Sequence, residues 1–445
     1  MTTKPITVPI ESEAASQWRV RAYQIAWALG LCFYFLEYAS RSAPAVMIQP
    51  LSLAFGTSAI GVSAILGTYY YTYSTTSLIA GAALDRLGAK KVVPVGIFIL
   101  ALGCLLFSVP TATAGYAGRL LQGAGSAFAF TGAVYLASHG FSARWLATAI
   151  GVTQCIGMLG GSAGQFVVGP WLEHGVAWQS IWHGLAVACV VVGILLFLIA
   201  PSESRQQASG SGWASLIRPY AIVFRNPQSY LCGAVAGLLF VPTTIGDMTW
   251  GVAFFQRDRM FSYHDAVVTG SLVPMGWVIG CPLLGWLADK MGRRKPALIG
   301  GAVVMLLAAA LITFSTGHRA AEIGCLIFGI ASGAAMIPYT IIKEVNPDEV
   351  KGSATGGINF LTFGVTALIG PIFADVLGKG FASTQNHIAH FRQSGVFWIG
   401  GIVIPVFNER YARERRTRMP RLQWWRKRYL PGRGRYGTNT SKAVG

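Results

Sequence analysis

The stretches GAALDRLGAKK, residues 81–91, and GWLADKMGRRK, residues 285–295, are near copies that lie 204 residues apart in a chain of 445 residues. Each follows a long apolar run. Each places an aspartate four residues after a glycine, then a second glycine three residues later, with basic residues behind it. One such segment is an ordinary turn at a membrane surface. Two copies at equivalent places indicate a duplicated membrane bundle, which makes the chain a transporter candidate.

The composition agrees with a membrane protein. Hydrophobic residues make up 53% of the chain and charged residues only 12%, whereas soluble proteins carry about 25% charged residues. Apolar runs long enough to cross a bilayer recur along the chain. We therefore expect an all-α membrane protein with two pseudo-symmetric bundles of six transmembrane helices. The twelve predicted spans lie near residues 22–50, 60–83, 92–109, 114–138, 147–171, 180–200, 229–255, 266–288, 296–314, 320–342, 353–377 and 391–408.

The spans divide the chain into five parts. A segment rich in serine, glutamine and glycine follows Pro201 and indicates a flexible linker between the two bundles. The predicted parts are an N-terminal cytoplasmic segment, 1–21; an N-terminal bundle, 22–200; a cytoplasmic linker, 201–228; a C-terminal bundle, 229–408; and a basic cytoplasmic tail, 409–445.

Lysines and arginines orient the bundles. With the N-terminus inside, 28 of the 35 basic residues fall on cytoplasmic segments and five on outer loops. This bias follows the positive-inside rule and predicts a multi-pass protein of the cell inner (plasma) membrane with both termini cytoplasmic. The net charge of +18 therefore reflects topology rather than an acidic partner.

The tail from Glu409 carries twelve basic and two acidic residues. Either it binds anionic lipids of the inner leaflet, or it is a disordered segment whose charge only enforces the topology. Nucleic-acid binding is not expected, because no folded recognition module accompanies the charge.

Enzymatic chemistry is not indicated. The seven cysteines fall singly inside the spans, without the spacing of a metal site or a disulfide framework, so no metal and no cofactor is expected. No histidine-rich metal motif, nucleophile elbow or phosphate-binding glycine loop is present in the sequence. We expect a monomer whose partners are a small-molecule solute, protons and membrane lipids. A non-transporting sensor built on a carrier fold stays as an alternative.

Four charged residues stand out within the predicted spans: Glu37, Arg41, Arg119 and Asp247. A charge in the hydrocarbon region costs at least about 2.5 kcal/mol and usually faces the protein interior. Glu37 and Arg41 share one helix face and can pair. Adding the repeat offset to Arg41 gives residue 245, so Asp247 is expected across the central cavity.

These charges predict a substrate site. Arg41 would bind an anionic group through its planar fork of donors, with Glu37 or Asp247 as the proton-coupling site. The alternative is a buried pair that only fixes the first span. Other predicted substrate contacts are Tyr69 and Tyr73, which share a helix face, and Gln154 and Asn359, which occupy equivalent positions in spans five and eleven. Packing between helices is the alternative for these four.

The paired loops after spans two and eight resemble the signature loop of the major facilitator superfamily. The resemblance covers residues 20–408 and implies a conformational latch on the cytoplasmic side, with Gly81, Asp85, Arg86 and Gly88 in one copy and Gly285, Asp289, Gly292 and Arg293 in the other. Arg119 with the following LLQG resembles the fourth-span motif of the superfamily, which implies a part in proton coupling. Gly151, Gly160 and Gly164 keep the glycine spacing of the antiporter motif, but Gln165 stands where that motif has proline.

Within the superfamily, residues 34–48 resemble the organophosphate and sugar-acid permease branch, whose members often hold an anion with an arginine in this helix. No basic residue lies between Arg225 and Arg257, so sugar-phosphate exchange is not expected. The resemblance and the buried charges together predict a secondary active transporter that moves a small organic anion or zwitterion by alternating access, as a proton symporter. The alternative is a proton-driven efflux antiporter of an amphipathic compound.

Overall fold

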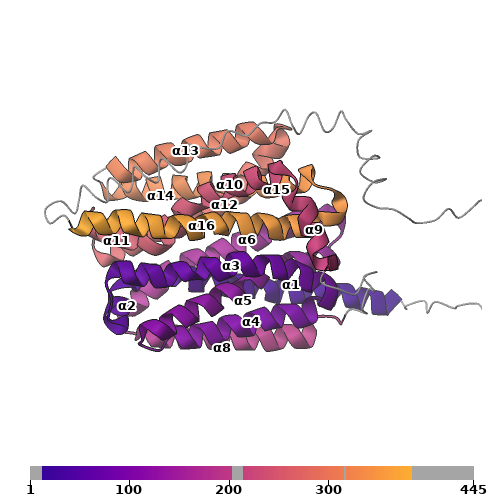
Figure 1. Ribbon diagram of the computed structural model, residues 1–445, viewed down its shortest axis with the longest axis horizontal. Helices are drawn as coiled ribbons and strands as arrows, with labels where there is room; N and C mark the ends of the chain where they lie inside the picture. Colours follow the sequence, from indigo (N-terminus) through magenta and orange to yellow (C-terminus); the bar gives the residue numbers. More distant parts are fainter. Residues whose placement is uncertain (1–12, 203–213, 315–316, 383–445) are drawn as a thin grey trace, which may run out of the picture. The chain divides into compact units, whose positions relative to one another are not determined.

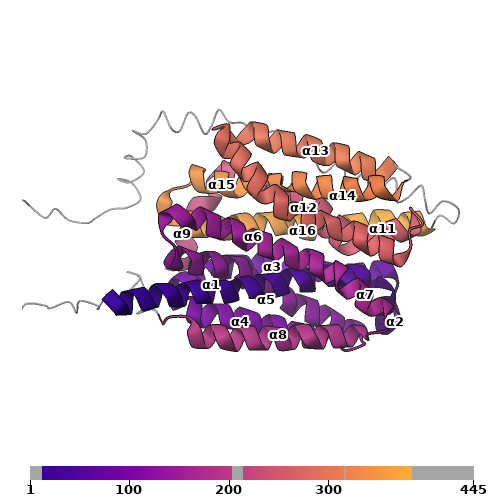
Figure 2. The same cartoon turned by 180° about the vertical axis from the view of Figure 1, so that it is seen from behind.

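The computed structural model describes residues 13–202, 214–314 and 317–382 (Figures 1 and 2). Within these ranges every regular element is a helix and no strand is present, so the all-α expectation is confirmed. The predicted last span, 391–408, and the basic tail lie outside the described residues.

The N-terminal bundle contains six long helices and three short ones. Their bounds are α1 (Glu13–Ser42), η1 (Ala43–Val46), α2 (Ile48–Phe55), α3 (Ala59–Leu87), α4 (Ala89–Phe107), α5 (Ala112–Gly140), α6 (Ala143–Phe166), α7 (Val168–Glu173) and α8 (Trp178–Ile199).

A helix of the connecting segment, α9 (Ala214–Phe224), leads into the C-terminal bundle. The remaining helices are α10 (Pro227–Val241), η2 (Pro242–Gly251), α11 (Val252–Arg257), α12 (Tyr263–Lys290), α13 (Arg294–Phe314), α14 (His318–Ser332), η3 (Gly333–Met336), α15 (Ile337–Val345), η4 (Asp348–Val350) and α16 (Lys351–Ala382).

The two bundles lie side by side along two helix pairs. In both ribbon views the helices up to α8 form one half and those from α10 onward form the other. Helix α3 of the first half packs along α16 of the second, and α6 packs along α12. Residues on these four helices are therefore placed at the boundary between the bundles. Residues of α1, which packs against α6, lie beside them.

Side-chain caps start several of the helices. Ser58, Thr111, Asn226 and Ser262 each accept a hydrogen bond from a main-chain N–H in the first turn of α3, α5, α10 and α12. A capping oxygen satisfies one of the donors that a helix N-terminus leaves without a partner. The four turns are thus fixed locally, and each directs a long helix back across the bundle.

The first and seventh predicted spans are interrupted. The first, 22–50, breaks after Ser42 into η1, with Pro44 inside it, and then α2. The seventh, 229–255, contains a π-helix, η2, that begins with Pro242. Proline removes a main-chain donor, and π-helical turns are frequent at functional sites. Both interruptions flank charged residues, Arg41 in one case and Asp247 in the other.

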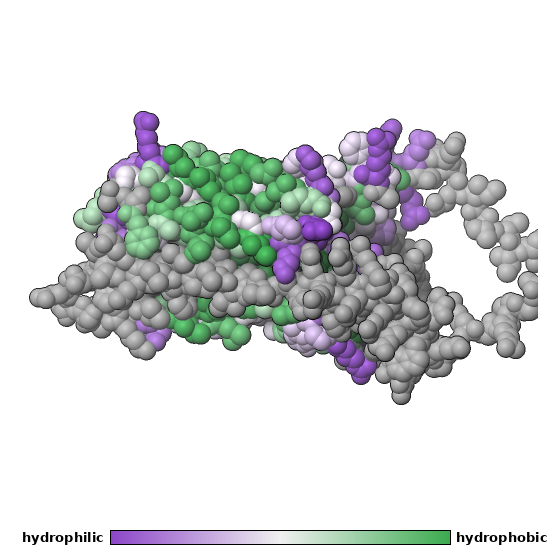
Figure 3. Space-filling model, turned by 90° about the horizontal axis from the view of Figure 1, so that it is seen from above, coloured by the Kyte–Doolittle hydropathy of each residue, from purple (hydrophilic) through white to green (hydrophobic). Residues whose placement is uncertain are grey.

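The surface has the apolar character of a membrane protein. In the described part of the chain, nine helices are long and apolar enough to cross a membrane, or ten if α2 and α3, bent by 98°, form one span. Helix α1, which carries Glu37 and Arg41, is not among them. Exposed apolar side chains such as Leu198, Leu307 and Leu368 face outward, and hydrophobic residues cover the middle of the molecule with hydrophilic ones toward its ends (Figure 3).

Candidate functional site

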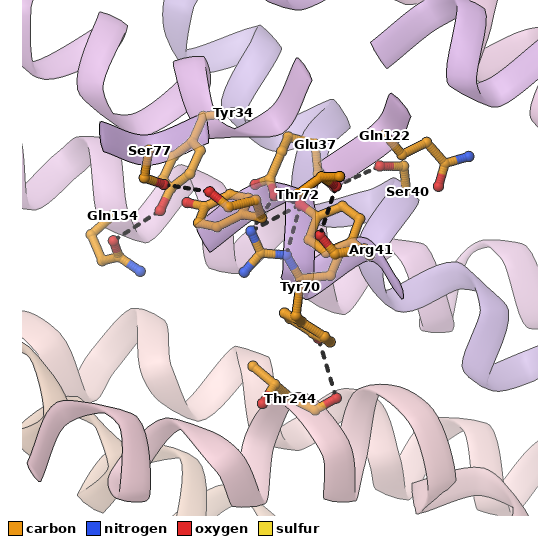
Figure 4. Close-up of polar contacts among 12 residues, drawn as sticks. Tyr34, Glu37, Ser40, Arg41, Tyr70, Thr72, Ser77, Gln122, Gln154 and Thr244 are labelled. Atoms are coloured by element: carbon orange, nitrogen blue, oxygen red, sulfur yellow. Dashed lines mark hydrogen bonds and ion pairs between the residues drawn. The ribbon is translucent and has the colours of Figure 1, made fainter. Parts of the chain in front are cut away.

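Arg41 lies at the centre of a buried polar cluster at the bundle boundary, with only 2% of the residue exposed. Its Nη2 donates to a carboxylate oxygen of Glu37 and, at 3.1 Å, to the hydroxyl of Tyr69, while its Nε donates to the same hydroxyl at 3.2 Å. Tyr69 in turn donates to Glu37. The i and i+4 pairing of Glu37 and Arg41 expected for α1 is therefore present (Figure 4). Helix α3 supplies the third member of the cluster, Tyr69.

Four aromatic rings surround the guanidinium, a set that we call the aromatic cage. The Cζ atom of Arg41 lies 4.3 Å from the ring centroid of Tyr38, 4.8 Å from Tyr73, and 5.1 Å from both Tyr69 and Phe363. These separations are those of cation–π contacts. Phe363 belongs to α16, so the second bundle closes the cage over an arginine of the first.

Two atoms of this ion pair have no hydrogen-bond partner among the described residues: Nη1 of Arg41 and Oε2 of Glu37. A buried polar atom without a partner costs on the order of 1–3 kcal/mol, and such atoms are rare outside functional sites. Arg41 therefore keeps donor capacity that the described protein groups leave unused.

Gln154 and Asn359 make similar contacts from opposite bundles. The hydroxyl of Tyr34 donates to Oε1 of Gln154 at 3.1 Å, and the hydroxyl of Tyr339 donates to Oδ1 of Asn359 at 2.7 Å. In both amides the oxygen is occupied, and the NH₂ group has no partner within the described ranges.

Both amides are connected to the aromatic cage. The ring of Tyr34 packs edge-on against that of Tyr38 at 5.1 Å. Asn359 lies one helical turn before Phe363 on α16 and therefore on the same face. The site thus contains donors from α1, α6 and α16 around one ion pair.

Arg119 lies beside the cluster without joining the ion pair. Its Nη1 donates to the main-chain oxygen of Ser40 at 3.2 Å and to Oε1 of Gln122 at 2.6 Å. Its Cζ lies 4.7 Å from the ring centroid of Tyr69. The ring of Tyr69 therefore contacts the guanidinium groups of both Arg41 and Arg119, and no carboxylate among the described residues pairs with Arg119.

Asp247 has a different partner from the one that the repeat offset suggests. Its Oδ2 accepts a hydrogen bond of 3.2 Å from Nε2 of Gln165, and it makes no contact with Arg41 among those described. The π-helix places Asp247 against α6 and α12, because Gly270 of α12 lies beside both polar side chains. Arg41 and Asp247 thus belong to two separate polar clusters, and the opposition of their charges across a central cavity stays a prediction.

The two signature loops share a glycine turn. Gly88 has a φ angle of +71° and Gly292 one of +61°, which glycine adopts without the strain that other residues incur. In the second copy, Asp289 pairs with Arg294, whose Nη2 also lies 3.0 Å from Glu344 of α15. The side chain of Asp85 is not among those described, so the latch stays a prediction.

A cavity of about 410 Å³ lies at the end of the bundles that the charge pattern places outside. We call it the outer cavity. Residues of both halves line it, among them Gln49, Glu173, Trp178, Gln256 and Tyr263. Beside it, Tyr263 donates to the main-chain oxygen of Val46 at 2.9 Å, which connects the bundles at this end.

Sequence reasoning missed several members of the cluster. Tyr38 and Phe363 complete the aromatic cage, while Tyr34 and Tyr339 orient the two amides. Tyr34 and Tyr38 stand three residues before and one residue after Glu37, so the i and i+4 spacing along α1 was an available signal for them. Phe363 and Tyr339 had none, because their places depend on how the second bundle packs against the first.

Comparison with known proteins identifies relatives of one kind. The family model described as Major Facilitator Superfamily matches residues 30–371. The glucose transporter GlcP of Staphylococcus epidermidis is 32% identical over 155 residues, so the match spans about a third of either chain, 34% of each. The "Probable galactarate/D-glucarate transporter GudP" of Bacillus subtilis is 23% identical over 385 residues, which cover 75% of this chain and 80% of that protein.

Solved structures share the same fold. A bacterial homolog of the human lysosomal transporter Spinster, in an inward-facing and unoccupied conformation, has a TM-score of 0.68 at 16% identity. The superposition covers 92% of this chain and 99% of that one. At this identity the likeness concerns the arrangement of the helices and not the solute.

Proposed function

The chain belongs to the Major Facilitator Superfamily and is a secondary transporter, and from this premise we propose that it carries a small organic anion or zwitterion together with protons, by alternating access. Transport of a solute, rather than catalysis, follows from the family and its relatives. The expected two-bundle major facilitator fold is confirmed, whereas the solute and the coupling are our proposal.

The observation that carries the proposal is the set of hydrogen-bond donors without partners around Arg41. Within the described part of the chain, the unused groups include Nη1 of Arg41 and the NH₂ groups of Gln154 and Asn359, all of which donate. A ligand that satisfies three donors must supply acceptors, and a carboxylate with further oxygens does so. The galactarate/D-glucarate relative, whose named solutes are such acids, supports this choice.

Charge balance supports proton coupling. Arg41 and Glu37 form a buried pair without net charge. A carboxylate that binds to Arg41 brings one negative charge into a site closed on both sides by protein, where an unbalanced charge is costly. A proton on Glu37 keeps the total charge of the site, in which Arg119 also lies, the same as before binding. We therefore propose that Glu37 takes up a proton when the anion binds, so that the two cross together.

The neighbouring residues have supporting parts in this proposal. Tyr69 and Tyr73 would contact the substrate anion from the cage. Arg119 would couple to Glu37 through Tyr69, whose ring it contacts and whose hydroxyl donates to Glu37. Asp247 is proposed as a further proton-binding residue, separate from the substrate. The signature loops would latch the inner side.

A ligand-stabilisation screen on the purified protein tests the proposal. Sugar acids, dicarboxylates and neutral hexoses are compared by thermal shift on the unaltered chain, on Arg41→Ala and on Arg41→Lys, which keeps the charge but loses the fork of donors. Loss of a hydrogen bond to a charged group should weaken acid binding by at least about tenfold. Arg144→Ala, at an exposed position, serves as the matched control.

The outcomes separate the alternatives. The proposal is supported if acids stabilise the unaltered chain and Arg41→Ala abolishes this effect. It is refuted if neutral hexoses alone stabilise the chain. It is also refuted if acids stabilise both Arg41 variants and the control equally. Uptake by energised vesicles with and without a proton gradient then gives the direction. Proton-driven loss of an amphipathic compound from the vesicles would instead favour the efflux antiporter.

A further inference from the structure

Gln165 and Asp247 form a buried contact between the two bundles that the proposed substrate site does not include. Gln165 is the penultimate residue of α6, and Asp247 lies in the π-helix η2. Nε2 of Gln165 donates to Oδ2 of Asp247 at 3.2 Å, and the two residues are 0% and 4% exposed. The contact is therefore closed to solvent in this conformation.

The other oxygens of the two side chains both lie beside Gly270 of α12. A Cβ atom on Gly270 would lie 2.9 Å from Oε1 of Gln165 and 3.4 Å from Oδ1 of Asp247. Within the described residues, Oε1 of Gln165 has no hydrogen-bond partner. An amide oxygen and an ionised carboxylate oxygen are both acceptors, so neither can satisfy the other unless one carries a proton.

We propose that Gln165 and Asp247 form a proton-binding site in which a carboxylic acid and an amide, joined by two reciprocal hydrogen bonds, close the outer side of the carrier. The N–H of Gln165 donates to one carboxyl oxygen, as observed, and the acid O–H of Asp247 donates to Oε1 of Gln165. Because Gly270 has no side chain, the space beside it is free for this second hydrogen bond. This inference rests on the proposed proton coupling and assigns it a second residue pair.

The surroundings favour a neutral acid at this place. Asp247 borders a cavity of about 40 Å³ that is otherwise lined mainly by apolar side chains. Cys325 of α14 is the other titratable residue among those that line it, and the described basic residues are absent from its wall. The ion pair of Glu37 and Arg41 lies on α1 and is internally balanced. A charged carboxylate here has no salt-bridge partner among the residues that the structure describes, and burying an unpaired charge is costly.

The cavity also has room for hydration of the acid. Its volume exceeds the roughly 10–15 Å³ that a cavity needs to hold one water molecule. Trp250 lines it as well, and its indole N–H has no partner among the described residues. Water held between Trp250 and Asp247 would place a polar contact on the side of the acid that faces away from Gln165.

The pair lies between the two bundles, so its hydrogen bonds can hold their outer ends together. Its neighbours on α6, α7 and α12 also connect the bundles: Ser162 of α6 donates to the main-chain oxygen of Ser271 at 3.0 Å, and Gly169 of α7 packs so closely on Val267 of α12 that an added Cβ would lie 2.6 Å from it. When the bundles part at this end, Asp247 meets outer water and takes up a proton from it. Closure then buries the neutral acid against Gln165. Loss of this proton returns the carboxylate, breaks the second bond and lets the outer side open again.

Labelling of an introduced cysteine at the outer cavity tests the pair without any substrate. Gln256 lines that cavity, and Gln256→Cys is labelled with a membrane-impermeant maleimide at pH 5.5 and pH 8 in lipid nanodiscs. Met260→Cys, at a position that is 79% exposed, corrects for the intrinsic pH dependence of the reagent, and the chain without either substitution gives the background.

We expect the corrected labelling rate at pH 5.5 to be about fivefold lower than at pH 8. One additional hydrogen bond of roughly 1 kcal/mol would increase the population of the closed state by this factor. Asp247→Asn replaces the acid O–H by an amide N–H and keeps both bonds, so its labelling should be slow at both values. Gln165→Leu removes both bonds, so its labelling should be fast at both. Gln228→Leu, at a buried glutamine of α10, should behave like the unaltered chain.

Corrected labelling that does not change with pH in the unaltered chain overturns this inference, and so does an Asp247→Asn variant that stays as pH-sensitive as that chain. Neither outcome bears on Arg41. Conversely, failure of acids to bind the unaltered chain refutes the proposed substrate while leaving the labelling result intact. The two proposals therefore fail by different measurements.

Discussion

Tyr220 donates a hydrogen bond of 2.7 Å to the main-chain oxygen of Leu78, so the helix that precedes the second bundle is bound to α3 of the first. The hydroxyl lies between two glycines: a Cβ on Gly81 would lie 3.3 Å from it, and a Cβ on Gly356 would lie 2.8 Å from it. The first glycine of the signature loop thus gives Tyr220 access to α3. This contact joins both bundles at the end that the charge pattern places inside.

Removing the Tyr220 hydroxyl should loosen the inner end. Tyr220→Phe loses one hydrogen bond, worth about 1 kcal/mol, which corresponds to a roughly fivefold larger open population. Hydrogen–deuterium exchange of α9 should rise by a similar factor. Tyr230→Phe, at a residue that is 49% exposed, is the matched control. Unchanged exchange in Tyr220→Phe would mean that the bond does not hold α9 in place.

The two copies of the signature loop should respond differently to the same substitution. A Cβ at Gly285 would meet nothing within 4 Å, whereas one at Gly81 meets Tyr220. Alanine stabilises a helix relative to glycine by about 1 kcal/mol, so Gly285→Ala should raise the thermal unfolding temperature. Gly81→Ala should gain less or lose stability, because Tyr220 must move.

A double substitution gives the control for this comparison. In the Tyr220→Ala background the obstacle at Gly81 is gone, so Gly81→Ala and Gly285→Ala should stabilise equally. A difference between the two alanines that persists there would assign the asymmetry to another contact of the first loop.

Removing the hydroxyl of Tyr69 should separate the ion pair from its third member. Tyr69→Phe keeps the ring between Arg41 and Arg119 but removes the donor to Glu37 and the acceptor for Arg41. Since hydrogen bonds to charged groups are worth about 1.5–3 kcal/mol, acid affinity should fall by about tenfold or more. Isothermal titration with the acid found in the ligand screen measures this change.

Tyr71→Phe is the neighbouring control for this variant. Tyr71 is 44% exposed on the same helix, so its substitution should leave affinity unchanged. If the Tyr69 and Tyr71 variants bind the acid with equal affinity, the Tyr69 hydroxyl takes no part in acid binding and has only a packing role.

Local spacing predicted the parts of the site that lie on one helix. The i and i+4 rule puts Glu37 beside Arg41 on α1, and Tyr69 beside Tyr73 on α3, whose rings stack at 5.7 Å. The duplication also predicted the equivalent glycine turns. In each case the geometry depends on a few residues that are close together in the chain, so the sequence alone is enough to predict it.

Contacts between the bundles could not be derived in this way. The repeat offset placed Asp247 opposite Arg41, but it predicted neither the π-helix that contains Asp247 nor the hydrogen bond that Asp247 accepts from Gln165. Gln165 was visible only as a departure from the antiporter motif, and its partner became evident once α6 was packed against η2. Phe363 enters the cage because α16 packs along α3. These relationships depend on the fit of whole helices, which no short pattern encodes.

Substitution of Glu37 tests the charge balance of the site. If each bound anion is accompanied by a proton on Glu37, acid affinity should rise as pH falls, by up to tenfold per pH unit in the range where free Glu37 is ionised. Glu37→Gln resembles the protonated residue, so its acid affinity should be high and independent of pH. Titrations from pH 5 to pH 8 measure both slopes.

The control for Glu37 is an acid at the outer cavity. Glu173→Gln removes a carboxylate whose side chain is 37% exposed and therefore well solvated, so it should keep the pH dependence of the unaltered chain. A Glu37→Gln variant that retains that dependence would show that the proton accompanying the anion resides elsewhere. Asp247 would then be the first residue to examine, because it is a buried acid whose hydrogen bond joins the two bundles. If affinity is independent of pH even in the unaltered chain, the anion crosses without a proton on either residue.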